Sequence, residues 1–408
     1  MGNPYFLMML LYLSVAVLAA LDVSLINLNL LPWFNGVRWL RIHFITLGML
    51  TQVLFGALPM LVAARHKLPR PAIRWDIWLT LNVGLVVLLA GIPSINQQLI
   101  FAGGTLILIA ATLLARQLWG MRSPHGQPSS PSVKFYVTGL LYLLLGIMVG
   151  TGLWLGWSGP LHMQVPLEVH IHANNWGFLS LVFAGLIIDM APQLSGQPLV
   201  SAGRQTIIFW SMTLGALGLV LGPWLGGALW VTVPGLVLHL TATLWLLGLL
   251  VRGLGRADQL RHAGAWHLVT AYVWILLPVL IAPLILLQVP GFVGGDIEAT
   301  APQALIYGWV LQFSFALIPF LLQRYLMGES KASLGGNWLS LLTVNGGSAL
   351  VWASIFIVPL RSSLQSAAYL CYVIALLLVA WQLGKMTRDW FKVMEQGALA
   401  QFTDSISA

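Results

Sequence analysis

Residues 167–198 read LEVHIHANNWGFLSLVFAGLIIDMAPQLSGQP, a stretch that joins a cluster of polar residues to a long apolar run. A carboxylate, two histidines and two asparagines stand at the start of an apolar run that carries no further charge before Asp189. Ionisable side chains at the edge of a bilayer are costly to desolvate, so they usually mark a site. We therefore expect a membrane-spanning helix whose first turns carry polar groups with a function.

The spacing of polar anchors and glycines in this stretch occurs twice more. The anchors are His43, His172 and Gln303, which lie 129 and 131 residues apart. Glycine follows each anchor at the fifth residue, and glycine or alanine follows at the thirteenth: Gly48 and Gly56, Gly177 and Gly185, Gly308 and Ala316. We infer three repeat units of about 130 residues, which suit a membrane bundle with internal symmetry. The units cover residues 1–131, 132–261 and 262–393, followed by a tail over 394–408.

The composition is that of a membrane protein. The 408 residues are 59% hydrophobic and only 7% charged, whereas about a quarter of the residues of a soluble domain are charged. The net charge of +8 does not gather on any soluble segment, so we expect a lipid bilayer as the environment and no nucleic-acid partner. The chain reads as one polytopic membrane domain over 1–408.

A helix needs about 20 apolar residues to cross the hydrocarbon layer. Dividing the chain at proline, glycine and charge predicts twelve spans, an all-α membrane fold of three pseudo-symmetric four-helix units. The predicted spans are 5–31, 39–64, 75–95, 98–119, 134–157, 167–192, 205–223, 228–251, 264–289, 302–326, 337–360 and 366–387. The polar tail has no pattern and is expected to be disordered.

The loops predict the orientation in the membrane. Of the 19 basic residues, 16 fall on one side of the predicted spans, and only Arg38, Arg41 and Arg361 fall on the other. The positive-inside rule then places both termini in the cytoplasm, in an inner or plasma membrane. His43, His172 and Gln303 would lie at one depth near the outer face.

The histidines of the second and sixth spans are candidate ligands, since neutral imidazole is the commonest protein ligand for transition metals. His170 and His172 are two residues apart, so at most one of them faces the bundle axis. Glu168 stands four residues before His172, which suits a carboxylate that accepts from the second ring nitrogen of a metal ligand. The alternative is a histidine at the membrane boundary that pairs with the carboxylate for helix capping.

Three further ionisable residues inside the predicted spans are candidates for a function. His239 is either a further metal ligand or a residue hydrogen-bonded between helices. Asp22 and His267 could belong to a proton path, although His267 lies more than about 10 Å deeper than the other histidines at 1.5 Å per residue. The alternatives are a carboxylate wetted at a helix end and a histidine that reaches the inner interface.

Twelve spans in three units, with histidine near the outer end of the second and sixth spans, resemble the catalytic subunit of haem-copper oxidases and nitric oxide reductases. The segment HANNWGFLSLVFAGLIIDMAPQLSGQPL, residues 172–199, is also similar to NnrS-type proteins, haem- and copper-containing membrane proteins associated with nitric oxide. The resemblance implies haem b and copper as cofactors. It implies that His43 is an axial haem ligand and that His172 or His170 is a copper ligand. The tenth span has Gln303 where the oxidases place histidines for two haems, so Gln303 is the candidate cofactor-binding residue opposite His43.

Three classes of function follow. The first is a haem- or copper-binding redox protein that handles nitric oxide or oxygen, or that takes electrons from quinol or another respiratory subunit; if it is an enzyme, it is an oxidoreductase. The second is a membrane transporter. The third is a structural or assembly subunit of a respiratory complex.

Overall fold

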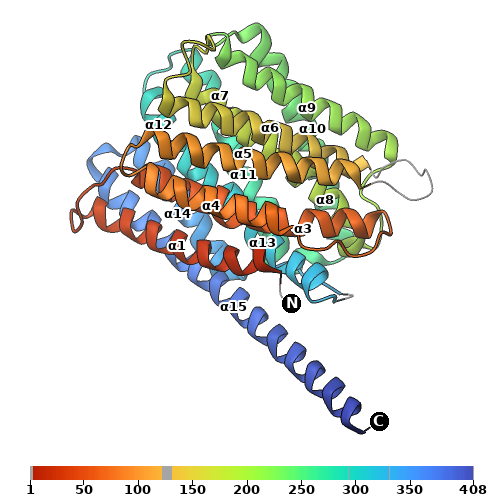
Figure 1. Cartoon of the computed structure of the whole chain (residues 1–408). Helices are drawn as coiled ribbons and strands as arrows, with labels where there is room; N and C mark the ends of the chain where they lie inside the picture. Colours follow the sequence, from red (N-terminus) through yellow and green to blue (C-terminus); the bar gives the residue numbers. More distant parts are fainter. Residues whose placement is uncertain (1–2, 122–130, 293, 330, 408) are drawn as a thin grey trace.

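The chain folds into a bundle of helices (Figure 1). The structure, a computed structural model, describes residues 3–121, 131–292, 294–329 and 331–407. This part of the chain is 83% helical and contains no strand. Eleven of its helices are long and apolar enough to cross a membrane. The predicted all-helical membrane fold is thereby confirmed, while the loop 122–130, which carries Arg122, lies outside the described residues.

The helices follow one another through short connections. Their bounds are α1 Pro4–Asn27, α2 Val37–His43, η1 Phe44–Leu50, α3 Thr51–Arg65, α4 Trp75–Gly91, α5 Gln97–Gly120, α6 Pro131–Leu155, α7 Pro166–His172, η2 Ala173–Leu179, α8 Ser180–Ser195, α9 Ala202–Trp224, α10 Leu229–Arg256, η3 Gln259–Arg261, α11 Ala263–Leu286, α12 Gly294–Ala304, η4 Leu305–Leu311, α13 Gln312–Leu321, η5 Leu322–Leu326, α14 Trp338–Phe356, η6 Val358–Leu360 and α15 Arg361–Ser407.

The third predicted span differs from the others in length. It corresponds to α4, which has 17 residues, fewer than the about 20 that cross the hydrocarbon layer. The helix ends at Gly91, and Pro93 lies two residues further on. Proline has no backbone N–H to donate to the helix, which accords with the end of α4 shortly before Pro93.

Three helices form the centre of the bundle, and each contains a π-helical segment. We call them the first (α2, η1, α3), second (α7, η2, α8) and third (α12, η4, α13) central helices. In their most apolar windows 89%, 89% and 100% of the residues are buried, against 28% to 61% in the other eight. The π-helical segments begin at residues 44, 173 and 305, one or two residues after the predicted anchors.

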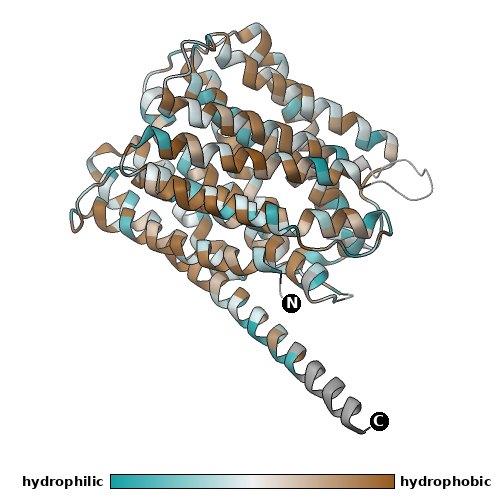
Figure 2. Ribbon diagram, in the orientation of Figure 1, coloured by the Kyte–Doolittle hydropathy of each residue, from teal (hydrophilic) through white to brown (hydrophobic). Residues whose placement is uncertain are grey.

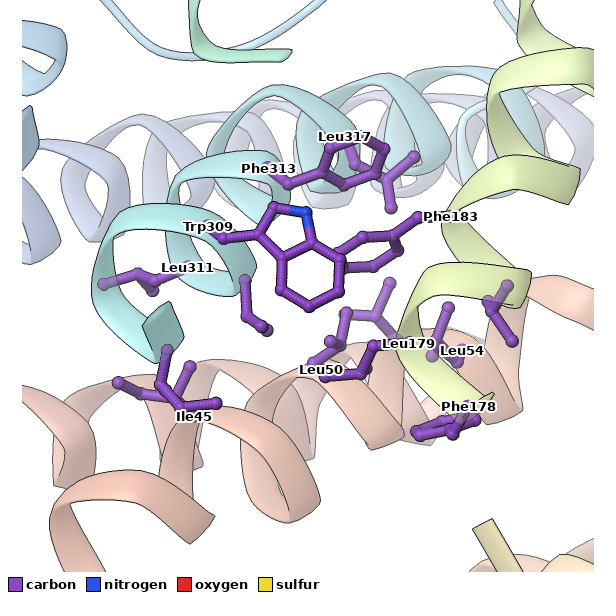
Figure 3. Close-up of a cluster of buried hydrophobic side chains, with 14 of the residues drawn as sticks. Ile45, Leu50, Leu54, Phe178, Leu179, Phe183, Trp309, Leu311, Phe313 and Leu317 are labelled. Atoms are coloured by element: carbon purple, nitrogen blue, oxygen red, sulfur yellow. The ribbon is translucent and has the colours of Figure 1, made fainter. Parts of the chain in front are cut away.

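The space where the three central helices meet is filled with apolar side chains (Figure 3). Trp309 of the third central helix is fully buried. It lies among Leu50 of the first central helix and Leu179 and Phe183 of the second. Phe183 also stacks on Phe313 with ring centroids 4.0 Å apart. Burial of large aromatic side chains therefore holds the middle of the bundle together.

One contact recurs in each third of the chain. An aromatic ring of a neighbouring helix packs on the central helix at the glycine of its π-helical segment and donates a hydrogen bond to a further helix. Tyr12 of α1 packs on Gly48 and donates to Asn82 Oδ1 at 3.2 Å. The counterparts are Tyr142 on Gly177, donating to the Thr213 carbonyl at 2.8 Å, and Trp274 on Gly308, donating to Asn345 Oδ1 at 2.9 Å. The grouping into three four-helix units remains a prediction.

The end of the bundle away from His43 and His170 holds an ion pair in which only the carboxylate is fully buried. Arg65 of the first central helix donates to Asp189 of the second at 2.6 Å, and the Tyr136 hydroxyl donates to the same carboxylate at 2.6 Å. The N-terminus lies towards this end, and α15 runs beyond it (Figure 1). Hydrophilic and hydrophobic residues alternate where α15 leaves the bundle (Figure 2). The tail, expected to be disordered, continues the helix to Ser407.

Candidate functional site: a histidine pair in an apolar cavity

His43 and His170 come together at one end of the bundle, which we call the histidine end. His43 is the last residue of α2 and His170 lies in α7, so the pair joins the first and second central helices. Their ring centroids are 6.2 Å apart and their ring planes meet at 30°. Both line a cavity of about 680 Å³, which falls within the range of about 300 to 1,000 Å³ of ligand and cofactor sites.

The backbone fixes the tautomer of His43. Its Nδ1 lies 2.9 Å from the carbonyl oxygen of Trp39, one turn earlier. A carbonyl oxygen only accepts, so Nδ1 carries the proton and Nε2 keeps its lone pair. The Trp39 indole also lies flat against the imidazole, with centroids 4.5 Å apart and planes at 8°. The Trp39 carbonyl therefore fixes one edge of the His43 ring, and the Trp39 indole covers one face.

His170 is fixed in the same way by α6. Its Nδ1 lies 2.8 Å from the carbonyl oxygen of Gly146 and 3.3 Å from the Asn174 Nδ2 atom. The shorter contact is to a carbonyl, which only accepts, so Nδ1 carries the proton and Nε2 is again the unprotonated nitrogen. Gly150 leaves space for the ring, because a Cβ there would come within 2.6 Å of the His170 Cε1 atom. Asn174 lies against Gly146 and donates to the His170 carbonyl at 2.8 Å. The site thus holds two imidazoles in the tautomer that binds metals.

Most of the cavity wall is apolar, but polar side chains also line it, including the carboxylate of Glu298. Arg41 lines the cavity and is only 9% exposed, yet its Nε has no hydrogen-bond partner among the described residues. No described carboxylate forms a salt bridge with it either. Asn175 also lines the cavity and is 6% exposed. A buried polar group without a partner is costly, so the Arg41 Nε atom fits a cavity whose ligand has polar groups of its own.

Gln303 lies in the wall of the same cavity, but its amide is already engaged. Its Oε1 accepts a hydrogen bond from the Tyr369 hydroxyl at 2.7 Å, and its Nε2 donates to the Ala299 carbonyl at 3.3 Å. The residue predicted at the depth of the histidines is therefore close to them. It acts as part of a hydrogen-bond network in the structure.

His172 turns away from the cavity. Its Nδ1 lies 2.6 Å from the Leu219 carbonyl of α9, and the ring is not among the groups that line the cavity. The sequence predicted Glu168 as the hydrogen-bond acceptor for the His172 ring. In the structure the acceptor is the Leu219 carbonyl. Glu168 itself lies half-buried at the start of α7. Of the two neighbouring histidines, only His170 faces His43.

His239 and His267 do not line the cavity, and both are hydrogen-bonded to other groups. His239 is fully buried; its Nε2 donates to the Trp176 carbonyl at 3.1 Å and its Nδ1 accepts from the Thr243 hydroxyl at 3.2 Å. Both ring nitrogens are engaged, so this residue ties α10 to the second central helix. His267 is also fully buried, and its Nε2 lies 2.9 Å from the Ser340 hydroxyl.

The predicted copper and proton groups are not gathered. Among the described residues, no three histidine, cysteine, aspartate or glutamate side chains come close enough together to hold a metal ion. His170, His172, His239 and Glu168 therefore do not form one site in this structure. Asp22 is half-buried near the end of α1 and forms no salt bridge within the described residues.

Several residues of the site were not found from the sequence. Gly146 and Gly150 form the cradle for His170, and they have a signal that could have been used: two glycines four residues apart, a spacing typical of close helix contacts in membranes. Trp39 has no comparable pattern, because its function depends on which groups the fold brings next to it. Asn175, in contrast, is one of the two asparagines that the sequence places at the start of the apolar run.

No protein-family model matches the sequence, and no curated protein matches it significantly.

Proposed function

We propose that this chain is a haem-binding membrane protein that holds the haem between His43 and His170. The observation that carries the proposal is the pair of imidazoles with free Nε2 atoms on two central helices. Two metal–nitrogen bonds of about 2 Å and two ring radii of about 1 Å would separate such rings by about 6 Å, close to the observed 6.2 Å. The glycine cradle and the partnerless Arg41 Nε fit a large ligand with polar substituents.

Backbone and side-chain groups would have different roles in such a site. The Trp39 and Gly146 carbonyls hold the two Nδ1 protons, which keeps both Nε2 atoms available as ligands. Apolar residues such as Ile107, Leu143 and Phe178 line the cavity and exclude water. A haem with two histidine ligands supplies one-electron transfer. The function supported best is thus electron transfer in a respiratory or nitric-oxide-linked chain, with quinol or another respiratory subunit as the donor.

We further propose that the chain is a distant relative of the haem-copper oxidases and nitric oxide reductases, or of NnrS-type proteins. The recurring ring contact at Gly48, Gly177 and Gly308 supports three units of similar structure. The chain would then share with these proteins the arrangement of its helices and one histidine on the second span, His43. His170 takes the opposite position, which differs from the expectation that Gln303 would lie across from His43.

Two alternatives use other features of the chain. Copper(I) could bind the same two Nε2 atoms, since soft monovalent copper accepts imidazole ligands. A transporter would need a substrate site near the middle of the membrane at the interface of its repeats. Trp309 and its neighbours fill that region here, so the packing favours the cofactor-binding function over transport.

The test is the haem content of purified wild-type protein and three variants, expressed with a supply of haem. His43→Ala and His170→Ala should each lose the six-coordinate haem spectrum, because each removes one ligand. His172→Ala is the matched control: it changes a histidine two residues from His170 that is bound to Leu219, outside the cavity. Equal haem loss in all three variants, or copper without haem in the wild type, would count against the proposal.

A further inference from the structure

We propose that Trp39 is a positioning residue that sets the plane of the His43 imidazole relative to that of His170. The inference rests on the proposed function, in which these two rings bind one iron. It concerns a property that the histidine pair alone does not fix: the angle at which the two ligand rings are turned.

Trp39 restrains the His43 ring in two ways. Its carbonyl oxygen accepts the Nδ1–H bond at 2.9 Å. That bond alone leaves the ring able to swing about the N–H···O direction. The Trp39 indole, 4.5 Å away and inclined by only 8°, lies along one face of the imidazole and limits this swing. Because Trp39 and His43 are four residues apart in α2, the helix places both restraints on the same side.

A different element restrains the second ring. His170 is bound to the Gly146 carbonyl and lies against Gly150, both in α6. The 30° angle between the rings therefore depends on two separate sets of contacts, those of Trp39 with His43 and those of α6 with His170. Removing the Trp39 indole should change only the orientation of His43, whereas its backbone carbonyl, which any residue provides, should keep the tautomer.

The angle has a measurable consequence. Each imidazole interacts with the iron through the π orbital perpendicular to its ring, so two nearly parallel rings split the iron d orbitals strongly and two perpendicular rings do not. Groups around a ligand tune a metal centre in this way. At 30° we expect a rhombic low-spin electron paramagnetic resonance (EPR) spectrum with three resolved g values, rather than the single large g value of perpendicular rings.

The experiment compares EPR spectra of oxidised wild-type protein, Trp39→Phe and Trp39→Leu, with Trp154→Leu as the control. Trp154 lines the same cavity. Trp39→Phe keeps a flat ring and should retain the rhombic signal. Trp39→Leu should move the largest g value upward while the optical spectrum still shows six-coordinate haem. Trp39→Met, which also lacks a flat ring, serves as a second variant if Trp39→Leu does not fold.

The outcomes separate the two claims. Haem in every protein with the same EPR signal in all of them overturns the role of Trp39 and leaves the histidine pair intact. An equal shift in Trp154→Leu also overturns it, because the effect would then belong to the cavity as a whole. A wild-type protein that binds no haem overturns the proposed function and this inference together.

Discussion

At the scale of single residues, the site depends on backbone carbonyl groups and on a glycine. The carbonyls of Trp39 and Gly146 set the tautomers of His43 and His170, and Gly150 provides the space for a ring. Backbone acceptors are useful in a membrane because they add no charge to be desolvated. The chemistry of the histidines is therefore controlled by the positions of helices.

Gly150→Ala should disturb the site directly. The added methyl group would come within 2.6 Å of the His170 Cε1 atom, and such overpacking costs about 1–3 kcal/mol. We expect weaker haem binding together with a lower unfolding temperature. Gly248→Ala is the control, because a Cβ at that position meets nothing within 4 Å. Haem titration that gives the same affinity for both variants would show that Gly150 is not part of the cradle.

His239→Ala should lower stability without changing the haem spectrum. The substitution leaves the Trp176 carbonyl and the Thr243 hydroxyl without their partner in the protein interior, at a cost of about 1–3 kcal/mol. Thermal unfolding in detergent measures the loss, and the absorption spectrum measures the haem. A loss of haem from well-folded His239→Ala would instead support the interpretation of His239 as a ligand.

The sequence predicted His43 but did not decide between His170 and His172. Those two residues point to different sides of α7, and the choice depends on how the helix is rotated against α6 and α9. That rotation follows from tertiary contacts with Gly150 and Leu219, for which a single sequence has no direct signal.

At the scale of elements, the three central helices share a design. Each has a π-helical segment that begins one or two residues after the anchors His43, His172 and Gln303, and each receives an aromatic ring at the glycine within it. π-helical segments often occur at functional sites. The glycine spacing was visible in the sequence, whereas the π-helical geometry and the matching rings were not, since no residue pattern marks them.

Removing the hydrogen bonds of the recurring rings tests whether the three contacts are equivalent. Tyr12→Phe, Tyr142→Phe and Trp274→Phe each delete one donor whose acceptor lies on another helix. We expect each variant to lose about 0.5–1.5 kcal/mol, with Trp274→Phe losing more because it also removes ring volume. Unfolding measurements in which one of the two tyrosine variants has no effect would argue against equivalent units.

At the scale of the whole molecule, the apolar runs predicted the spans well because crossing a bilayer demands length and hydrophobicity that few other structures need. α4 is the exception, shortened before Pro93. The tail was misjudged because its polar residues continue the helix of α15 instead of leaving it. The packed centre around Trp309 had no signal in the sequence, because apolar residues that face lipid and those that face a core have the same composition.

The orientation in the membrane remains a prediction, and reporter fusions can test it. Fusions at residues 70, 126 and 254 should report the cytoplasm, and fusions at residues 93, 160 and 296 the outside, because 16 of 19 basic residues lie on one side of the spans. The histidine end would then face outward. A reporter at residue 70 that reads as external would reverse the molecule and place the cavity near the cytoplasm.

Near-infrared magnetic circular dichroism of the oxidised protein identifies both axial ligands of a low-spin haem in one spectrum. We predict the charge-transfer band of bis-histidine iron for the wild type, because His43 and His170 are the only histidines among the residues that line the described cavity. His172→Ala should leave that band in place. A band of a histidine with some other ligand, or a haem-free protein after expression with haem, would contradict the assignment of this cavity as a bis-histidine haem site.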